Sequence, residues 1–78
     1  MEKISEILGW YGVAAIFVAY ALLSFNIIES SSLIYQALNL TGSLGIIYDA
    51  FRDKNYQPVV LNILWAVIAA FALVKIIL

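Results

Sequence analysis

The sequence has no cysteine and no histidine among its 78 residues. These absences exclude disulfide bonds, thiol nucleophiles, the usual zinc sites and the commonest general base of enzymes. Charged residues are also scarce, at 12% of the chain, against roughly 25% in a typical soluble domain. A net charge of −1 without any basic stripe argues against nucleic-acid binding. No pairing of a nucleophile with a base is visible, so we expect neither an enzyme nor a bound cofactor.

What fills the chain instead is hydrophobic sequence, which makes up 65% of it. Three long runs carry no charge, namely Ile7–Ile28, Ser30–Tyr48 and Asn55–Val74. A helix needs roughly 20 mostly apolar residues to cross the hydrocarbon core of a bilayer. A soluble protein this small exposes much of its surface to water, and so few charged side chains could not cover that surface. We therefore predict an all-α integral membrane protein that forms a single domain over residues 1–78.

Turn-forming residues divide the chain into three predicted transmembrane helices, at about residues 4–28, 33–51 and 58–78. The first turn contains Ser30, Ser31 and Ser32, and serine is a good N-cap because its side-chain oxygen accepts a hydrogen bond from a free backbone N–H. Pro58 suits the start of the third helix, where its missing N–H costs nothing. Turns this short make helices that are neighbours in sequence antiparallel.

The first apolar run resembles a secretory signal peptide in its position, but its flanking charge does not fit. Met1–Glu6 contains two Glu and one Lys, whereas a signal peptide needs a positively charged start. We interpret the run as a permanent helix. Lys3, Arg52 and Lys54 then lie on one side of the membrane and Lys75 near the other, so the positive-inside rule predicts a cytoplasmic N-terminus.

Polar side chains within the predicted spans are costly in hydrocarbon and are therefore candidates for function. On the second helix, one face repeats every three or four residues and carries Tyr35, Asn39, Gly42, Ile46 and Asp49. A cluster of Tyr20, Asn39 and Gln36 is compatible with the expected depths of these residues. We expect Asp49 to pair with Arg52 or Lys54 at the interface rather than to carry a proton or an ion.

Packing is the alternative explanation for these residues. Small side chains allow helices to approach closely, and Asn then forms hydrogen bonds across the contact. Gly42, Gly45 and Ala66 would in that case be packing notches, and Asn39 would join helices. We expect a homodimer to form on such small residues, chiefly on Gly42 and Gly45 of the second helix or on Ala66 and Ala70 of the third.

Part of the sequence resembles the SemiSWEET half-transporters, which are relatives of the SWEET and PQ-loop proteins. The second helix ends in Tyr48-Asp49-Ala50-Phe51-Arg52, and the third begins with Pro58-Val59-Val60-Leu61-Asn62. In that family a Tyr closes the second helix, a basic turn follows, and a Pro starts the third helix ahead of an inward-facing Asn. The resemblance implies a 1-3-2 helix bundle, a symmetric homodimer and a substrate pocket at its axis that contains Asn62. The first helix lacks the proline of the family, and Ile46 or Ile47 stands near the place of its pocket Trp.

The chain as a whole is also similar to a family of small, uncharacterised bacterial inner-membrane proteins. Four short patterns carry this second resemblance: Gly9-Trp10-Tyr11-Gly12, Ala19-Tyr20, Asn39-x-x-Gly42 and Asn62-x-x-Trp65. They span most of the length of the chain. The resemblance implies a location in the bacterial inner membrane and implies no activity.

Together these observations favour a SemiSWEET-like half-transporter that dimerises to pass a small neutral solute. Paired repeats are the usual way in which such folds build a binding site at the membrane midplane. Asn39 and Asn62 would form hydrogen bonds with the solute, and Trp65 and Tyr20 would wall it. The alternative is an accessory or scaffold subunit that transports nothing and binds another membrane protein.

Overall fold

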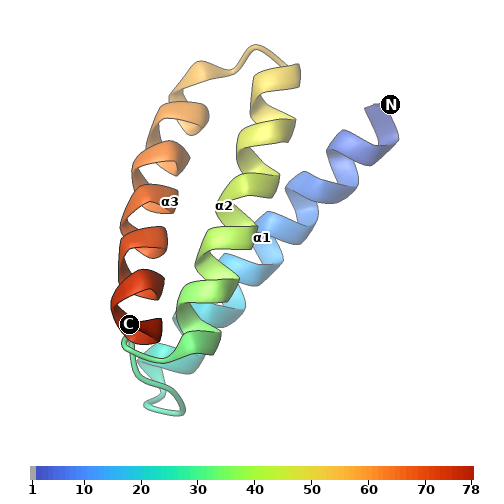
Figure 1. The fold of residues 1–78 in the computed structure, drawn as a ribbon. Coiled ribbons are helices and arrows are strands. Elements are labelled where there is room, and N and C mark those ends of the chain that lie inside the picture. The colour runs from blue at the N-terminus through green and yellow to red at the C-terminus, as the bar shows by residue number, and fades with distance from the viewer. Residues whose placement is uncertain (1) are drawn as a thin grey trace.

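The computed structural model describes residues 2–78, and within them the chain forms three α-helices (Figure 1). Helix α1 covers Glu2–Ser24, α2 covers Leu33–Arg52 and α3 covers Tyr56–Ile77. The predicted all-helical fold and the order of its elements are therefore confirmed. The main difference is that α1 ends at residue 24, before the predicted end at residue 28.

The early end of α1 has a local cause at Asn26. This residue has a φ of 60°, in the left-handed region, which Asn tolerates better than most residues. The backbone N–H groups of Asn26 and Ile27 then turn back to the carbonyls of Leu23 and Leu22, at 3.0 and 2.9 Å. This is the hydrogen-bond pattern of a Schellman motif, which closes the helix. Lys54, with a φ of 57°, occupies the same position after α2.

The turn between α1 and α2 ends at a capped helix start, as predicted. The side chain of Ser32 accepts a hydrogen bond from the backbone N–H of Tyr35 at 3.0 Å. Helix α3 begins at Tyr56, which places Pro58 in its first turn, where a backbone N–H has no partner within the helix.

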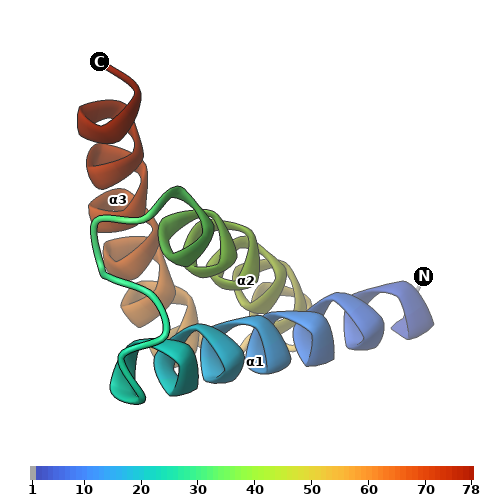
Figure 2. The same ribbon diagram turned by 90° about the horizontal axis from the view of Figure 1, so that it is seen from below.

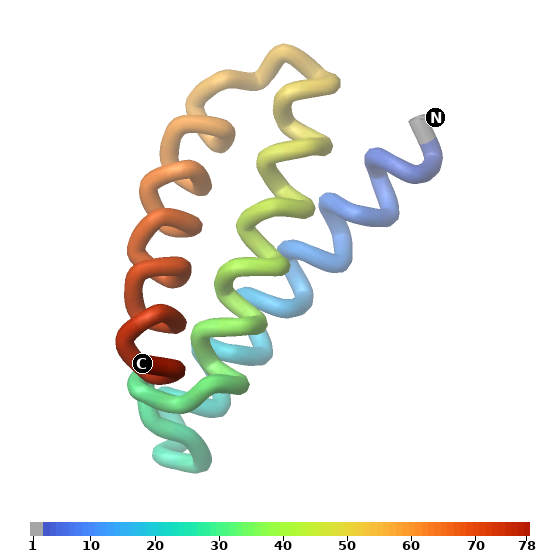
Figure 3. The backbone as a smooth tube through the Cα atoms, viewed as in Figure 1, coloured from blue at the N-terminus to red at the C-terminus, as the bar shows by residue number. Residues whose placement is uncertain are grey.

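Helix α2 lies between the other two helices (Figure 2). It contacts both α1 and α3, whereas no Cα atoms of α1 and α3 approach within 8 Å in the described part of the chain. The 1-3-2 order that the SemiSWEET resemblance implied is therefore wrong, because there the third helix would be central. The tube in Figure 3 shows α2 and α3 as an antiparallel pair and α1 crossing α2 at an angle.

The physical reason for this order is the distribution of small residues along the helices. Gly42 and Gly45 turn one side of α2 toward α1, while α3 turns Ala66 and Ala69 inward. A Cβ built on Gly12 would collide with the Gly42 carbonyl oxygen, and one built on Gly45 would collide with the Leu8 carbonyl. The backbones of α1 and α2 are thus in direct contact. The glycines on which we expected a homodimer are already used within one chain.

The interior of the bundle consists of small and polar side chains, and the largest side chain that is fully buried is that of Ser43. The exposed surface carries the large apolar residues, including Trp10, Phe17 and Phe71. Other than glycine, the buried residues are Ser5, Ala15, Ala19, Asn39, Ser43, Ala50, Asn62, Ala66 and Ala69. This burial is the reverse of the pattern in a soluble protein, whose interior holds the large aliphatic side chains.

Two of the helices, over Lys3–Ser24 and Tyr56–Ile77, are long and apolar enough to cross a membrane. The prediction of three transmembrane helices is thus supported by length and composition for α1 and α3 only. Helix α2 falls below this level of hydropathy because it carries Gln36, Asn39 and Asp49.

The contact between α1 and α2 predicts the effect of Gly45→Ala. In an exposed helix this change would add up to about 1 kcal/mol of stability through helix propensity. Here the new methyl group would overlap the Leu8 carbonyl, so we expect a net loss of about 1–3 kcal/mol from overpacking. Unfolding in mixed detergent micelles, followed by circular dichroism, measures this loss.

Ala14→Leu is the matched control because it adds bulk on the exposed side of α1. It should leave the unfolding free energy nearly unchanged. A Gly45→Ala variant more stable than the wild type would contradict the close approach of the two helices.

Candidate functional site

Several cavities lie along α2, among them two that combine polar and apolar side chains in their lining. The first, here called the amide pocket, has a volume of about 250 Å³ and is lined by Ser30, Tyr35, Gln36, Asn39, Trp65, Ile68 and Ala69. The second, here called the carboxylate pocket, has a volume of about 320 Å³ and is lined by Gly9, Trp10, Val13, Ile46, Asp49, Ala50, Asp53, Asn55 and Pro58. Both therefore include residues from the polar face of α2 that the sequence pattern indicates.

The amide pocket brings together two of the predicted binding residues, Asn39 and Trp65. The indole Nε1 of Trp65 donates a hydrogen bond to Asn39 Oδ1 at 3.4 Å, across the contact between α2 and α3. Asn39 is buried, whereas Trp65 is 46% exposed. The hydrogen bond is longer than the usual 2.7–3.2 Å and is therefore weak. A polar group entering the pocket would meet the amide of Asn39 beside a broad aromatic ring.

Asn62 is buried one turn from Trp65 but does not line the amide pocket. Its Nδ2 donates to the Pro58 carbonyl oxygen of its own helix at 2.8 Å. This amide nitrogen is therefore satisfied within α3.

The structure does not bring Tyr20 into the amide pocket. Tyr20 is 64% exposed on α1, and α1 does not contact α3 within the described residues. Gln36 does line the pocket, where its Nε2 donates to the Ser30 carbonyl oxygen at 2.7 Å. Of the cluster expected from depth alone, Gln36 and Asn39 share a pocket and Tyr20 lies outside it.

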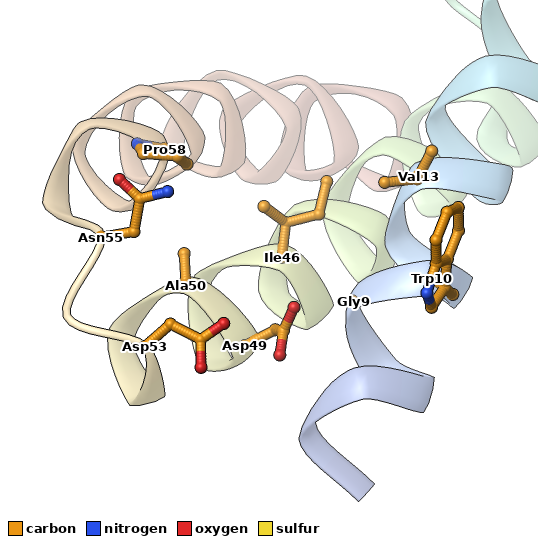
Figure 4. A pocket seen from close by; sticks show the side chains of 9 residues that line it. All are labelled: Gly9, Trp10, Val13, Ile46, Asp49, Ala50, Asp53, Asn55 and Pro58. Atoms are coloured by element: carbon orange, nitrogen blue, oxygen red, sulfur yellow. The ribbon is translucent and has the colours of Figure 1, made fainter. Parts of the chain in front are cut away.

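In the carboxylate pocket, Asp49 lies beside Gly9 of α1 (Figure 4). Ser5 Oγ donates to Asp49 Oδ1 at 2.6 Å, and Ser5 is only 3% exposed. Gly9 provides the space for this carboxylate, because a Cβ at Gly9 would overlap the Asp49 side chain. Figure 4 shows Asp49 on α2 and Asp53 directly after the end of that helix, with Trp10 on α1.

The expectation that Asp49 pairs with Arg52 or Lys54 is wrong. Asp49 forms its hydrogen bond with Ser5, and among residues 2–78 it has no salt bridge to any cationic side chain. The reason is geometric: Asp49 lies on the side of α2 that faces α1, so its carboxylate reaches Ser5 and Gly9. The sequence analysis did not identify Ser5 and Gly9 as partners of Asp49. A signal was present, because Ser5, Gly9 and Gly12 are small residues spaced four and three positions apart and so lie on one face of a helix.

The hydrogen bond between Ser5 and Asp49 predicts the effect of Ser5→Ala. The substitution leaves a partly buried carboxylate without its donor, which costs about 1–3 kcal/mol. Unfolding in mixed micelles should show this loss, and Ser31→Ala, in the exposed turn, should show none. A Ser5→Ala protein as stable as the wild type would mean that this contact does not hold α1 to α2.

Comparison with known proteins gives a family and no further relatives. No curated protein and no solved structure matches the chain, so the resemblance to SemiSWEET proteins gains no support. The sequence model of a small, uncharacterised family matches residues 5–78, which is nearly the whole chain. The protein therefore belongs to that family.

Proposed function

We propose that this chain is an integral membrane protein that binds a small neutral polar solute in the amide pocket, as one half of a transport unit. The hydrogen bond between Asn39 and Trp65 inside that pocket is the observation that carries the proposal. It combines hydrogen-bonding groups with an aromatic wall at the contact between two helices. Sites between the helices of a bundle commonly bind small molecules in this way.

The reversed burial supports insertion into a membrane. Only 22% of the α1 span and 17% of the α3 span is buried inside the protein, although both spans are strongly apolar. In water, an apolar surface of this extent would drive association. Lipid instead solvates such a surface, and small interior residues then let the helices pack by dispersion.

The position of α2 is also consistent with insertion. Polar side chains in hydrocarbon need partners, since lipid offers none. Asn39 and Ser43 are both buried within the bundle. A central α2 hides these groups behind two more apolar helices, so the least hydrophobic helix can still lie within the bilayer.

The lining of the amide pocket supports a neutral solute. None of the residues that line it is charged. The amide of Asn39 can both donate and accept hydrogen bonds, and the Trp65 ring offers an apolar face. Hydroxyl and amide groups fit these partners, whereas a charged group would find no counter-charge there.

We propose that a second copy of this chain is needed for transport. The amide pocket lies at the contact of only two helices, and one three-helix unit provides little wall for a pathway. Because Gly42 and Gly45 pack within the chain, the second copy would bind through the large apolar side chains that remain outside.

The second candidate function is that of an accessory subunit. Trp10, Phe17 and Tyr20 follow one face of α1 at helical spacing and are all more than 60% exposed. A helix of another membrane protein would cover this aromatic row. Purification that yields a defined complex with a different membrane protein, and no solute binding, would favour this function.

Membrane topology can be tested with single cysteines, because the chain contains none of its own. Cysteines at Ser31 and Asn55, in the two turns, lie at opposite ends of α2. A membrane-impermeant maleimide should label Ser31→Cys in intact cells and Asn55→Cys only after permeabilisation. Labelling of both from the same side would show that α2 does not cross the membrane, and the reverse pattern would place the N-terminus outside.

Solute binding can be followed by the fluorescence of Trp65. The chain contains only one other tryptophan, Trp10, which a substitution can remove. In the Trp10→Phe variant the fluorescence reports on Trp65 alone. In lipid nanodiscs, glycerol, urea and glucose form a first panel, and we expect at least one to shift the emission to saturation. Asn39→Ala should weaken that binding about tenfold, which corresponds to roughly 1.4 kcal/mol.

Two controls make this measurement specific. Gln57→Ala removes an exposed amide that lies outside the amide pocket and should leave the titration unchanged. Lactate and choline should produce no shift, because the pocket has no charged side chain. An emission spectrum that no neutral solute changes would count against the proposed function.

A further inference from the structure

We propose that Ser43 and Asn62 form an inner level of the amide pocket, at which a bound solute places a second polar group. This inference rests on the proposed function, since it concerns the same site. In this proposal Ser43 and Asn62 both bind the solute. Among residues 2–78, the side chain of Asn62 forms a hydrogen bond only within its own helix. The solute class becomes narrower as well: a neutral molecule with two or more hydroxyl or amide groups.

Ser43 is the starting observation. Its side chain is 0% exposed, and its hydroxyl has no hydrogen-bond partner in the described chain. An unpartnered polar group in an apolar interior is unfavourable, and nearly all buried polar groups have a partner. Alanine would fill the same space and would lack the polar group. The hydroxyl is therefore a candidate for a partner that comes from outside the chain.

The register of the two helices places Asn62 at the level of Ser43. Helices α2 and α3 are antiparallel (Figure 1), and the hydrogen bond between Asn39 and Trp65 fixes one level of their contact. Ser43 follows Asn39 by one turn on α2, and Asn62 precedes Trp65 by about one turn on α3. Both residues are buried. The next level of the contact is therefore a second polar pair.

The hydrogen-bonding capacity at this level is only partly used. Asn62 Nδ2 donates to Pro58, while Asn62 Oδ1 accepts no hydrogen bond within residues 2–78. Ser43 offers a hydroxyl that can donate and accept. A hydroxyl group of a solute could therefore accept from Ser43 and donate to Asn62.

In this proposal the Trp65 ring moves when a solute passes from the pocket to the inner level. Its hydrogen bond to Asn39 is long, at 3.4 Å, and its ring is about half exposed. A solute hydroxyl that replaces the indole N–H on Asn39 would free the ring to turn outward.

The distance between the two levels determines how long a solute must be to contact both of them. Asn39 and Ser43 are four residues apart on α2, which corresponds to a rise of about 6 Å. A solute that contacts both must carry polar groups separated by several bonds. A longer linear polyol meets this requirement, whereas the two adjacent hydroxyls of ethylene glycol do not.

The test uses Trp65 emission in the Trp10→Phe background, in lipid nanodiscs. The probes are linear polyols of increasing length: ethylene glycol, glycerol, erythritol and xylitol. We expect affinity to rise with length, and Ser43→Ala to weaken binding of the longer polyols about three- to tenfold while ethylene glycol is unaffected. Asn62→Ala should show the same dependence on length. Ser31→Ala, in the exposed turn, is the control and should match the parent.

Thermal unfolding of the same variants separates binding from packing. Ser43→Ala should be as stable as its parent or more stable, because it removes an unpartnered hydroxyl. Unchanged affinity of Ser43→Ala for every polyol, in a parent that does bind them, would overturn this inference and leave the proposed function standing. A parent that binds no polyol and no other neutral solute would overturn both.

Discussion

The direct contact between the backbones of α1 and α2 is the constraint on which the rest of the structure depends. Gly12 and Gly45 each lie against a carbonyl of the neighbouring helix, at a distance that leaves no room for a Cβ. This approach makes α2 the central helix, since α1 covers one side of it and α3 covers another. It also sets Asp49 beside Ser5 and leaves the amide pocket at the contact with α3.

The small and polar residues of the interior indicate in which solvent the bundle is stable. A core that buries alanine, glycine and Ser43 but no large aliphatic side chain gains little from the hydrophobic effect in water. The same core suits lipid, where close packing and interhelical hydrogen bonds hold helices together. The hydrogen bonds of Ser5 with Asp49 and of Trp65 with Asn39 are of this kind.

Particular residues show how far sequence reasoning reached. The pattern correctly picked out Asn39 and Asp49 as interior polar residues of α2, but the single face that it predicted divides between two contacts, since Asn39 meets α3 and Asp49 meets α1. Ser32 caps that helix as expected. Helix bounds were close except at Asn26, whose left-handed backbone ends α1 early. The partner of Asp49 was wrong because proximity along the chain favours Arg52. The actual partner, Ser5, is 44 positions away and is brought near only by the crossing of α1 over α2.

The sequence by itself determined that the chain is helical, about where the helices lie, and at which positions they carry polar side chains. Those properties follow from local periodicity and turn chemistry, which act over a few residues. Only the tertiary structure decided that α2 is central and that Asn39 meets Trp65 while Tyr20 stays outside. The physical reason is that helix order depends on which backbones can approach most closely. That depends on the fit between two surfaces, and neither helix reveals it alone.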